Sequence, residues 1–145
     1  MSEENIAASR RLIEEAFNKG NVSAIDEVVA DDFVGHDALT GDQDREASKQ
    51  SIAAYRDAFP DIHIAIDDIF DADDKVVLRW SGQGTFENEM MGLQPTHEKG
   101  DPIRGITIDR YEGDKLAESW TYWDTLTFMR NLGAVRTETA ASSGS

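Results

Sequence analysis

The sequence predicts an α+β domain in which a cone-shaped, curved antiparallel sheet wraps around three N-terminal helices. Two observations support this fold class. Apolar residues recur at helical spacing up to Pro60, and beyond Pro60 they alternate with a period of two. Helices that are followed by long strands are typical of the α+β class, and such a sheet buries its apolar face by curving around the helices. The curvature would create a concave pocket, which is a natural site for a small molecule.

Three helical segments are expected before Pro60. Ile6, Leu12 and Phe17 share one face of the first helix. Gly20 is placed to end it, because glycine adopts the positive φ of a helix C-terminus without strain. Ser23 has the form of an N-cap for the second helix. The helices are expected over residues 5–19, 24–29 and 42–59, with a short extended piece at 31–37.

Alternating apolar residues predict about four strands after Pro60. Gly82 and Gly84 lie within the second strand, which fits a strand that bends sharply. Asp124 is placed to cap a final helix. The strands are expected over residues 61–70, 75–86, 103–111 and 115–123, and the final helix over 126–132. Residues 1–133 are therefore expected to form a single domain, and residues 134–145 a flexible tail.

The composition limits the possible partners. The 145 residues include 29 acidic and 14 basic side chains, and the net charge of −15 repels the phosphate backbone of nucleic acids. No long apolar run predicts a membrane span, and the first residues lack the pattern of a signal peptide. We therefore expect a cytoplasmic protein that binds neither nucleic acid nor membrane. The absence of cysteine excludes disulfides and thiolate metal sites.

Several segments resemble the SnoaL-like polyketide cyclase and ester cyclase family over roughly residues 5–133. The matching segments are Met91-Gly92-Leu93-Gln94-Pro95-Thr96, Arg104 to Tyr111, Gly113 to Leu116, Trp123 to Leu126 and Leu132-Gly133, with Phe17 to Asn21 and Asp31 to Phe33 nearer the start. The resemblance implies the fold of nuclear transport factor 2 and a homodimer that forms through the open side of the sheet. For the polyketide-cyclising members it implies an intramolecular aldol condensation by a carboxylate, without metal or organic cofactor.

The chain departs from the family at the positions that carry this chemistry. The family's catalytic aspartate falls at Thr121, and a threonine cannot take the proton. The assisting histidine falls at Thr107, a glutamine at Gly105 and an asparagine at Gly35. Four polar groups are replaced together, which indicates a pocket rebuilt for a different ligand or reaction.

Asp109 and His36 are the candidate catalytic residues. Asp109 lies two residues beyond Thr107, so alternation points its carboxyl group to the same face. His36 lies near the end of the first extended piece, close to the expected pocket mouth, where an imidazole could act as acid or base. The alternatives are that Asp109 is solvated, or paired with Arg110 or Lys115, and that His36 is a turn histidine bonded to Asp37. The expected pocket wall consists of Thr107, Thr121, Trp123, Tyr55 and Gly35.

The other histidines, His63 and His97, are expected to be exposed, and three widely spaced histidines predict no metal site. Two functions remain open at this point. One is a cofactor-free cyclase, isomerase or lyase that acts on a small hydrophobic carbonyl compound. The other is a non-catalytic protein that binds a small hydrophobic molecule or acts through its dimer.

Overall fold

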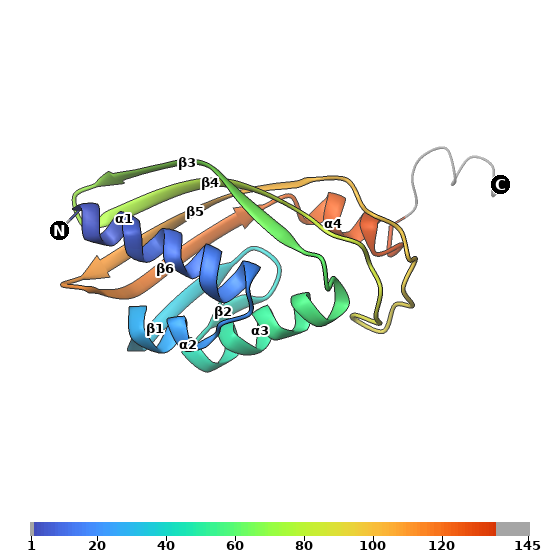
Figure 1. The fold of residues 1–145 in the computed structure, drawn as a ribbon, viewed down its shortest axis with the longest axis horizontal. Coiled ribbons are helices and arrows are strands. Elements are labelled where there is room, and N and C mark those ends of the chain that lie inside the picture. Colours follow the sequence, from blue (N-terminus) through green and yellow to red (C-terminus); the bar gives the residue numbers. More distant parts are fainter. Residues whose placement is uncertain (1, 136–145) are drawn as a thin grey trace.

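A single sheet curves around the helices in the computed structural model, which describes residues 2–135 (Figure 1). The six strands lie in the order β2-β1-β6-β5-β4-β3. In chain order the elements are α1 (Ser2–Arg11), η1 (Leu12–Asn18), α2 (Ser23–Val28), β1 (Val29–Asp37), β2 (Gly41–Gln43), α3 (Arg45–Ala58), β3 (His63–Ala72), β4 (Lys75–Gln83), β5 (Ile103–Glu112), β6 (Lys115–Trp123) and α4 (Thr125–Asn131). The α+β class and the curved sheet predicted from the sequence are confirmed.

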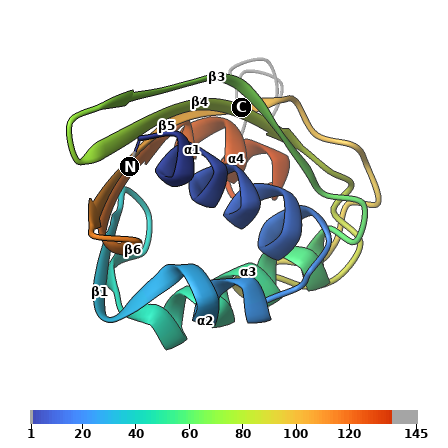
Figure 2. The ribbon, with the colours of Figure 1, turned by 60° about the vertical axis from the view of Figure 1, so that its left-hand side comes forward.

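The helices α1, α2 and α3 lie on the concave side of the sheet (Figure 2). The sheet supplies its inward residues to two apolar clusters. The larger joins the first helices to the middle strands through Ala16, Ile25, Phe33, Val76, Leu78, Tyr111 and Leu116. The smaller joins α3, α4 and the long loop through Ala58, Phe59, Phe86, Phe128 and Leu132. The two clusters fix the helices at a distance that leaves space over the centre of the sheet.

The first helix changes its winding before it ends. The α-helix α1 continues into the π-helix η1, where one helix over residues 5–19 was predicted. Two residues hold the end of η1: Arg56 donates hydrogen bonds to the carbonyl groups of Phe17 and Asn18, and Asn18 pairs with both backbone groups of Ile64 on the edge strand β3. These contacts satisfy carbonyl groups that a helix terminus leaves without partners. They also tie the helix to the edge of the sheet.

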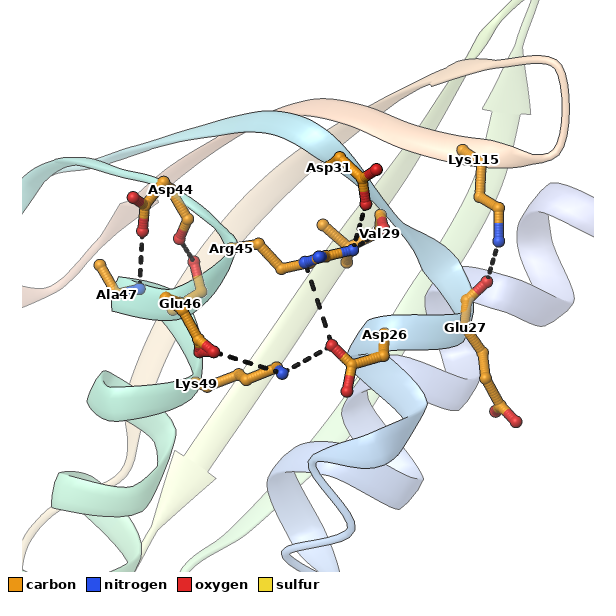
Figure 3. A network of polar contacts seen from close by, with 11 residues as sticks. Asp26, Glu27, Val29, Asp31, Asp44, Arg45, Glu46, Ala47, Lys49 and Lys115 are labelled. Carbon is orange, nitrogen blue, oxygen red and sulfur yellow. Dashed lines mark hydrogen bonds and ion pairs between the residues drawn. The ribbon is translucent and has the colours of Figure 1, made fainter.

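Ion pairs hold α3 beside α2 and β1, as Figure 3 shows. Arg45 donates to Asp31 at 2.8 Å, and Lys49 contacts Asp26 at 2.6 Å. Asp44 caps α3 by accepting a hydrogen bond from the backbone of Ala47. Asp44 belongs to a short polar stretch after β2, so α3 begins slightly later than predicted. The position of α3 matters because this helix carries Tyr55 to the centre of the molecule.

The predicted boundaries are accurate in the second half and less so in the first. The final hairpin occurs as predicted, and Asp124 caps α4 by accepting from the backbone of Thr127. Val22 rather than Ser23 is the N-cap of α2, since the Ser23 hydroxyl donates to Asn21 instead. The strand β2 was not predicted, and β1 pairs in parallel with β6, so the sheet is mixed.

Other expectations concern the surface and the ends of the chain. Tyr122, 70% exposed, and Ile106 lie on the outer face of the sheet. The homodimer contact expected there stays a prediction. Most of the expected tail, residues 136–145, lies outside the described residues. Within residues 2–135, no helix is long and apolar enough to cross a membrane.

Candidate functional site

A cavity of about 280 Å³ lies between the helices and the concave face of the sheet. This volume is close to the lower end of the range of small-molecule sites. Its wall is mainly apolar. The polar residues that interrupt it are Ser9, Asp37, Gln43, Ser48, Ser51, Tyr55, Gln83, Asp101, Thr107, Asp109, Ser119, Thr121 and Asn131.

The register of three strands brings five of these polar residues together. Thr107 of β5 lies opposite Thr121 of β6, and Asp37 of β1 pairs with Thr121 from the other side. Asp109 lies opposite Ser119 in the next inward-facing row. Residues two positions apart on a strand share a face, so all five side chains point to the concave side.

Asp109 is the most deeply buried carboxyl group of the wall, with 5% of its surface exposed. The Ser9 hydroxyl donates to its Oδ2 at 2.7 Å, and the Tyr111 hydroxyl lies 2.8 Å from the same serine oxygen. Burial raises the pKa of Asp109 to about 6, while the hydrogen bonds from Ser9 and Ser119 limit the rise. Asp109 can therefore exchange a proton close to neutral pH.

Thr107 and Thr121 form a short chain of hydrogen bonds with Trp80. The indole Nε1 of Trp80 donates to Oγ1 of Thr107 at 3.0 Å, and the two threonine hydroxyls are 3.0 Å apart. If Thr107 donates to Thr121, the hydroxyl hydrogen of Thr121 is free to point into the cavity. Thr121, at which the resemblance places the family's catalytic aspartate, can thus present a hydroxyl donor to the cavity.

Gly105 packs closely against Trp80 and Trp123, beside this chain of hydrogen bonds. An added Cβ would lie 2.4 Å from Cζ2 of Trp80 and 2.8 Å from Cβ of Trp123. A side chain here would force the Trp80 indole away from Thr107. A residue with a side chain, such as the glutamine that the resemblance implies here, therefore does not fit at position 105 without a shift of its neighbours.

Replacing Gly105 with alanine is expected to lower the free energy of unfolding by about 1–3 kcal/mol, as overpacking of a core does. Urea denaturation measures the loss, and the indole N–H resonance of Trp80 should shift as its hydrogen bond to Thr107 breaks. Arg104→Ala, an exposed change on the same strand, is the control and should stay within about 0.5 kcal/mol of the wild type. A fully stable Gly105→Ala protein with an unshifted indole resonance would contradict the close packing.

Asp37, Trp123 and Tyr55 make a second polar region of the wall. The Trp123 indole donates to Oδ1 of Asp37 at 3.2 Å. The backbone N–H groups of Leu39 and Thr40 donate to the same oxygen at 2.8 and 3.1 Å. Burial, with the nearby Asp37 carboxylate, raises the pKa of Tyr55 to about 12. Tyr55 therefore keeps its proton at neutral pH.

His36 does not line the cavity, and the expectation that it lies at the pocket is corrected here. Its ring stacks on Trp120 on the outer side of the sheet and contacts Asp42 at 2.8 Å and Glu118 at 2.7 Å. Glu118 first, and then Asp42, raise the pKa of His36. The physical reason is alternation: His36 lies three positions after the inward-facing Phe33, an odd number, so the two side chains face opposite sides of the sheet.

The remaining expected wall residues have mixed outcomes. The structure places Thr107, Thr121, Trp123 and Tyr55 on the cavity wall. Gly35 is not part of the wall, because the Phe33 ring covers it. His63 and His97 are exposed, as expected. Among residues 2–135, no group of three acidic or histidine side chains could hold a metal ion.

The sequence analysis missed Asp37, Ser9 and Ser119 as cavity residues. Asp37 and Ser119 carried a usable signal, because each lies an even number of positions from another inward-facing residue: Asp37 from Phe33 and Ser119 from Thr121. Ser9 had no such signal, since its contact with Asp109 spans 100 positions of the chain.

Comparisons with known proteins agree with this geometry. IdmH from Streptomyces antibioticus, a candidate polyketide cyclase, superimposes with a TM-score of 0.77 at 28% sequence identity, over 89% of this chain and 98% of IdmH. AclR from Streptomyces galilaeus, a candidate hydroxylase, gives 0.82 at 22% identity, over 94% and 100% of the two chains. A candidate SnoaL-like polyketide cyclase from Jannaschia sp. CCS1 gives 0.83 at 17% identity, over 93% and 95%.

A search of curated protein sequences finds no match. The sequence model of the SnoaL-like polyketide cyclases, in contrast, matches residues 7–132. The structural neighbours share the nuclear transport factor 2-like arrangement of a curved sheet around N-terminal helices. Because the match spans the helices, the sheet and the whole cavity between them, this chain belongs to the SnoaL-like polyketide cyclase family.

Proposed function

We propose that the protein is a cofactor-independent acid–base enzyme of the cyclase, isomerase or lyase type, acting on a small hydrophobic carbonyl compound. The observation that carries the proposal is the carboxyl group of Asp109, buried in the wall of a mainly apolar cavity. A carboxylate in this position can remove a proton from the carbon next to a carbonyl group. The neutral acid can then return the proton to carbon or to oxygen.

The pKa of Asp109 suits this role. A general base works best when its pKa lies near the working pH, because it is then both ionised and basic. The ordinary pKa of an aspartate is far below neutral, and burial raises that of Asp109 to about 6. At neutral pH the group is mostly ionised and is a stronger base than an exposed carboxylate.

Thr121 supports the same reaction from the neighbouring row. Proton removal places negative charge on the carbonyl oxygen of the substrate. The chain from Trp80 through Thr107 to Thr121 orients a hydroxyl group toward the cavity and can donate to this oxygen. Donors that are already oriented stabilise a developing oxyanion without reorganisation. In this scheme Thr121 assists the reaction and Asp109 is the base.

The test is proton exchange in a model ketone. The C1 protons of 2-tetralone, a bicyclic ketone of suitable size and polarity, are followed by proton NMR in deuterium oxide with and without protein. The expected result is exchange faster than with an equal concentration of acetate, with a rate that rises through an apparent pKa of about 6. Exchange no faster than with acetate would contradict the proposal that this cavity carries out acid–base chemistry on a carbonyl compound.

One observation favours the non-catalytic alternative. Asp109 is already hydrogen-bonded by Ser9, which also contacts Tyr111, and such a network can serve packing alone. A protein that only binds a small hydrophobic molecule would take up 2-tetralone without accelerating its exchange. Ligand-induced shifts of the Trp80 and Trp123 indole resonances, observed without faster exchange, identify this case.

A further inference from the structure

The cavity wall contains three carboxyl groups and no basic side chain. Asp37, Asp101 and Asp109 all line it, whereas none of the lining residues is a lysine, arginine or histidine. A buried anionic ligand requires a positive partner or several donors to offset the loss of its hydration. This wall offers no positive partner and adds repulsion from like charges, so it is unsuited to carboxylate or phosphate ligands.

The two carboxyl oxygens of Asp37 differ in their hydrogen bonds. Its Oδ1 accepts hydrogen bonds from Trp123, Leu39 and Thr40. Its Oδ2 accepts none from any residue of the described chain. The three contacts fix the orientation of the carboxyl group, and the second oxygen remains available to a donor in the cavity.

The hydroxyl group of Tyr55 is a hydrogen-bond donor on the same part of the wall as this free acceptor. It makes no hydrogen bond with the described residues, and the Asp37 carboxylate is close enough to influence its pKa. The ring is held edge-on by Trp123 and Phe128, with centroid distances of 6.5 and 5.8 Å. Because Trp123 contacts both the Asp37 carboxyl group and the Tyr55 ring, the acceptor and the donor lie on the same aromatic part of the wall.

This pair lies apart from Asp109. Asp37 and Asp109 are separated by the strand β6 and by one inward-facing row. With strands about 4.8 Å apart and a rise of about 3.4 Å per residue, their Cα atoms are roughly 12 Å apart, and less across the concave face. One bicyclic or tricyclic molecule can reach both regions.

We propose that Asp37 and Tyr55 form a second binding subsite, which recognises a hydroxyl group of the ligand. The ligand hydroxyl donates to Oδ2 of Asp37 and accepts from the hydroxyl of Tyr55. The substrate is then an uncharged hydroxylated compound, such as a phenol, and not a free acid. The subsite deepens the proposed function, because it defines the end of the substrate that lies opposite the carbonyl group. It rests on the proposed function for the position of the carbonyl group.

The subsite is tested by calorimetric titration with three naphthalene probes at neutral pH. 2-Naphthol carries the hydroxyl donor, 2-methoxynaphthalene only an acceptor, and 2-naphthoate a negative charge. We expect 2-naphthol to bind at least tenfold more tightly than 2-methoxynaphthalene, which corresponds to the loss of about one hydrogen bond to a charged group. We expect 2-naphthoate to bind most weakly.

Asp37→Asn is the informative variant, because an amide keeps the Oδ1 acceptor but replaces the free acceptor with a donor. It should remove the preference for 2-naphthol over 2-methoxynaphthalene and improve binding of 2-naphthoate. Tyr55→Phe, which leaves Asp37 unchanged, should weaken 2-naphthol several-fold and still exclude 2-naphthoate. Asp71→Asn, an exposed charge removal on β3, should bind all three probes as the wild type does.

Equal affinities for 2-naphthol and 2-methoxynaphthalene in the wild type would overturn the proposal. Tighter binding of 2-naphthoate, an unchanged preference in Asp37→Asn, or no binding of any probe would do the same. These outcomes are independent of catalysis, since they are read from binding alone. If the protein did not accelerate 2-tetralone exchange but bound the three probes with the expected preferences, the acid–base function would be rejected and the subsite retained.

Discussion

Asp109→Asn is expected to slow the exchange of the C1 protons of 2-tetralone by roughly 10²- to 10⁴-fold, the usual contribution of a general base. The amide has nearly the same shape and can still hydrogen-bond to Ser9 and Ser119, but it cannot accept the substrate proton. Proton NMR of the variant and the wild type under identical conditions measures the ratio. The rate that remains should no longer depend on a group with a pKa of about 6.

A matched control separates this effect from the loss of any negative charge. Asp71→Asn removes a charge from an exposed position of β3 and should exchange 2-tetralone at the wild-type rate. If Asp109→Asn retained the wild-type rate and its pH profile, Asp109 would not be the base. The cavity would then have to act through Asp37 or Asp101, the other carboxyl groups of its wall.

The same substitution is expected to stabilise the folded protein at neutral pH by up to about 3 kcal/mol. This value follows from the pKa of Asp109, raised from 3.8 to about 6, at about 1.4 kcal/mol per unit. Ionised Asp109 is more costly to bury than the neutral amide. Urea unfolding of wild type and Asp109→Asn at several pH values measures the difference.

The direction of the pH dependence follows from proton binding. Because the folded pKa lies above the unfolded one, the folded state binds the proton of Asp109 more tightly. This contribution to stability is complete below about pH 3.8 and is lost as the pH rises through about 6. The advantage of Asp109→Asn should therefore grow across this window and level off above about pH 7.

His36 requires its own control in this experiment. Glu118 and Asp42 raise its pKa, so its contribution is also present at low pH and is lost as the pH rises through the folded pKa. His36→Gln removes that part of the profile, and the difference between Asp109→Asn and wild type should remain in this background. A difference that did not change with pH would show that the Asp109 carboxyl group titrates normally.

Much of the sheet was predictable because alternation is a local signal. The inward direction of Asp109 followed from its two-residue spacing from Thr107, and the final hairpin from its alternating strands around Gly113. The same rule, counted from Phe33, would have turned His36 outward and Asp37 inward. His36 was expected at the pocket because it lies near the end of the extended piece at 31–37, and this position along the strand does not decide which face a side chain occupies.

Other features depend on contacts between distant parts of the chain. The parallel pairing of β1 with β6 joins residues more than eighty positions apart. The π-helical end of the first helix depends on Arg56 and Ile64, which contact it only in the folded state. No local pattern encodes such contacts. At these places tertiary packing overrides the secondary-structure propensity of the local sequence.

The hydrogen bond between Ser9 and Asp109 joins two layers of the molecule, since Ser9 belongs to α1 and Asp109 to β5. This bond lowers the proton affinity that burial raises. One of the contributions to the pKa of Asp109 therefore depends on the spacing between helix and sheet. Asn18, which pairs with Ile64 on the edge strand, helps to hold the first helix against the sheet although it makes no contact with Asp109. We therefore expect that packing changes distant from the cavity can alter the pH range of the proposed reaction without any substitution in the cavity wall.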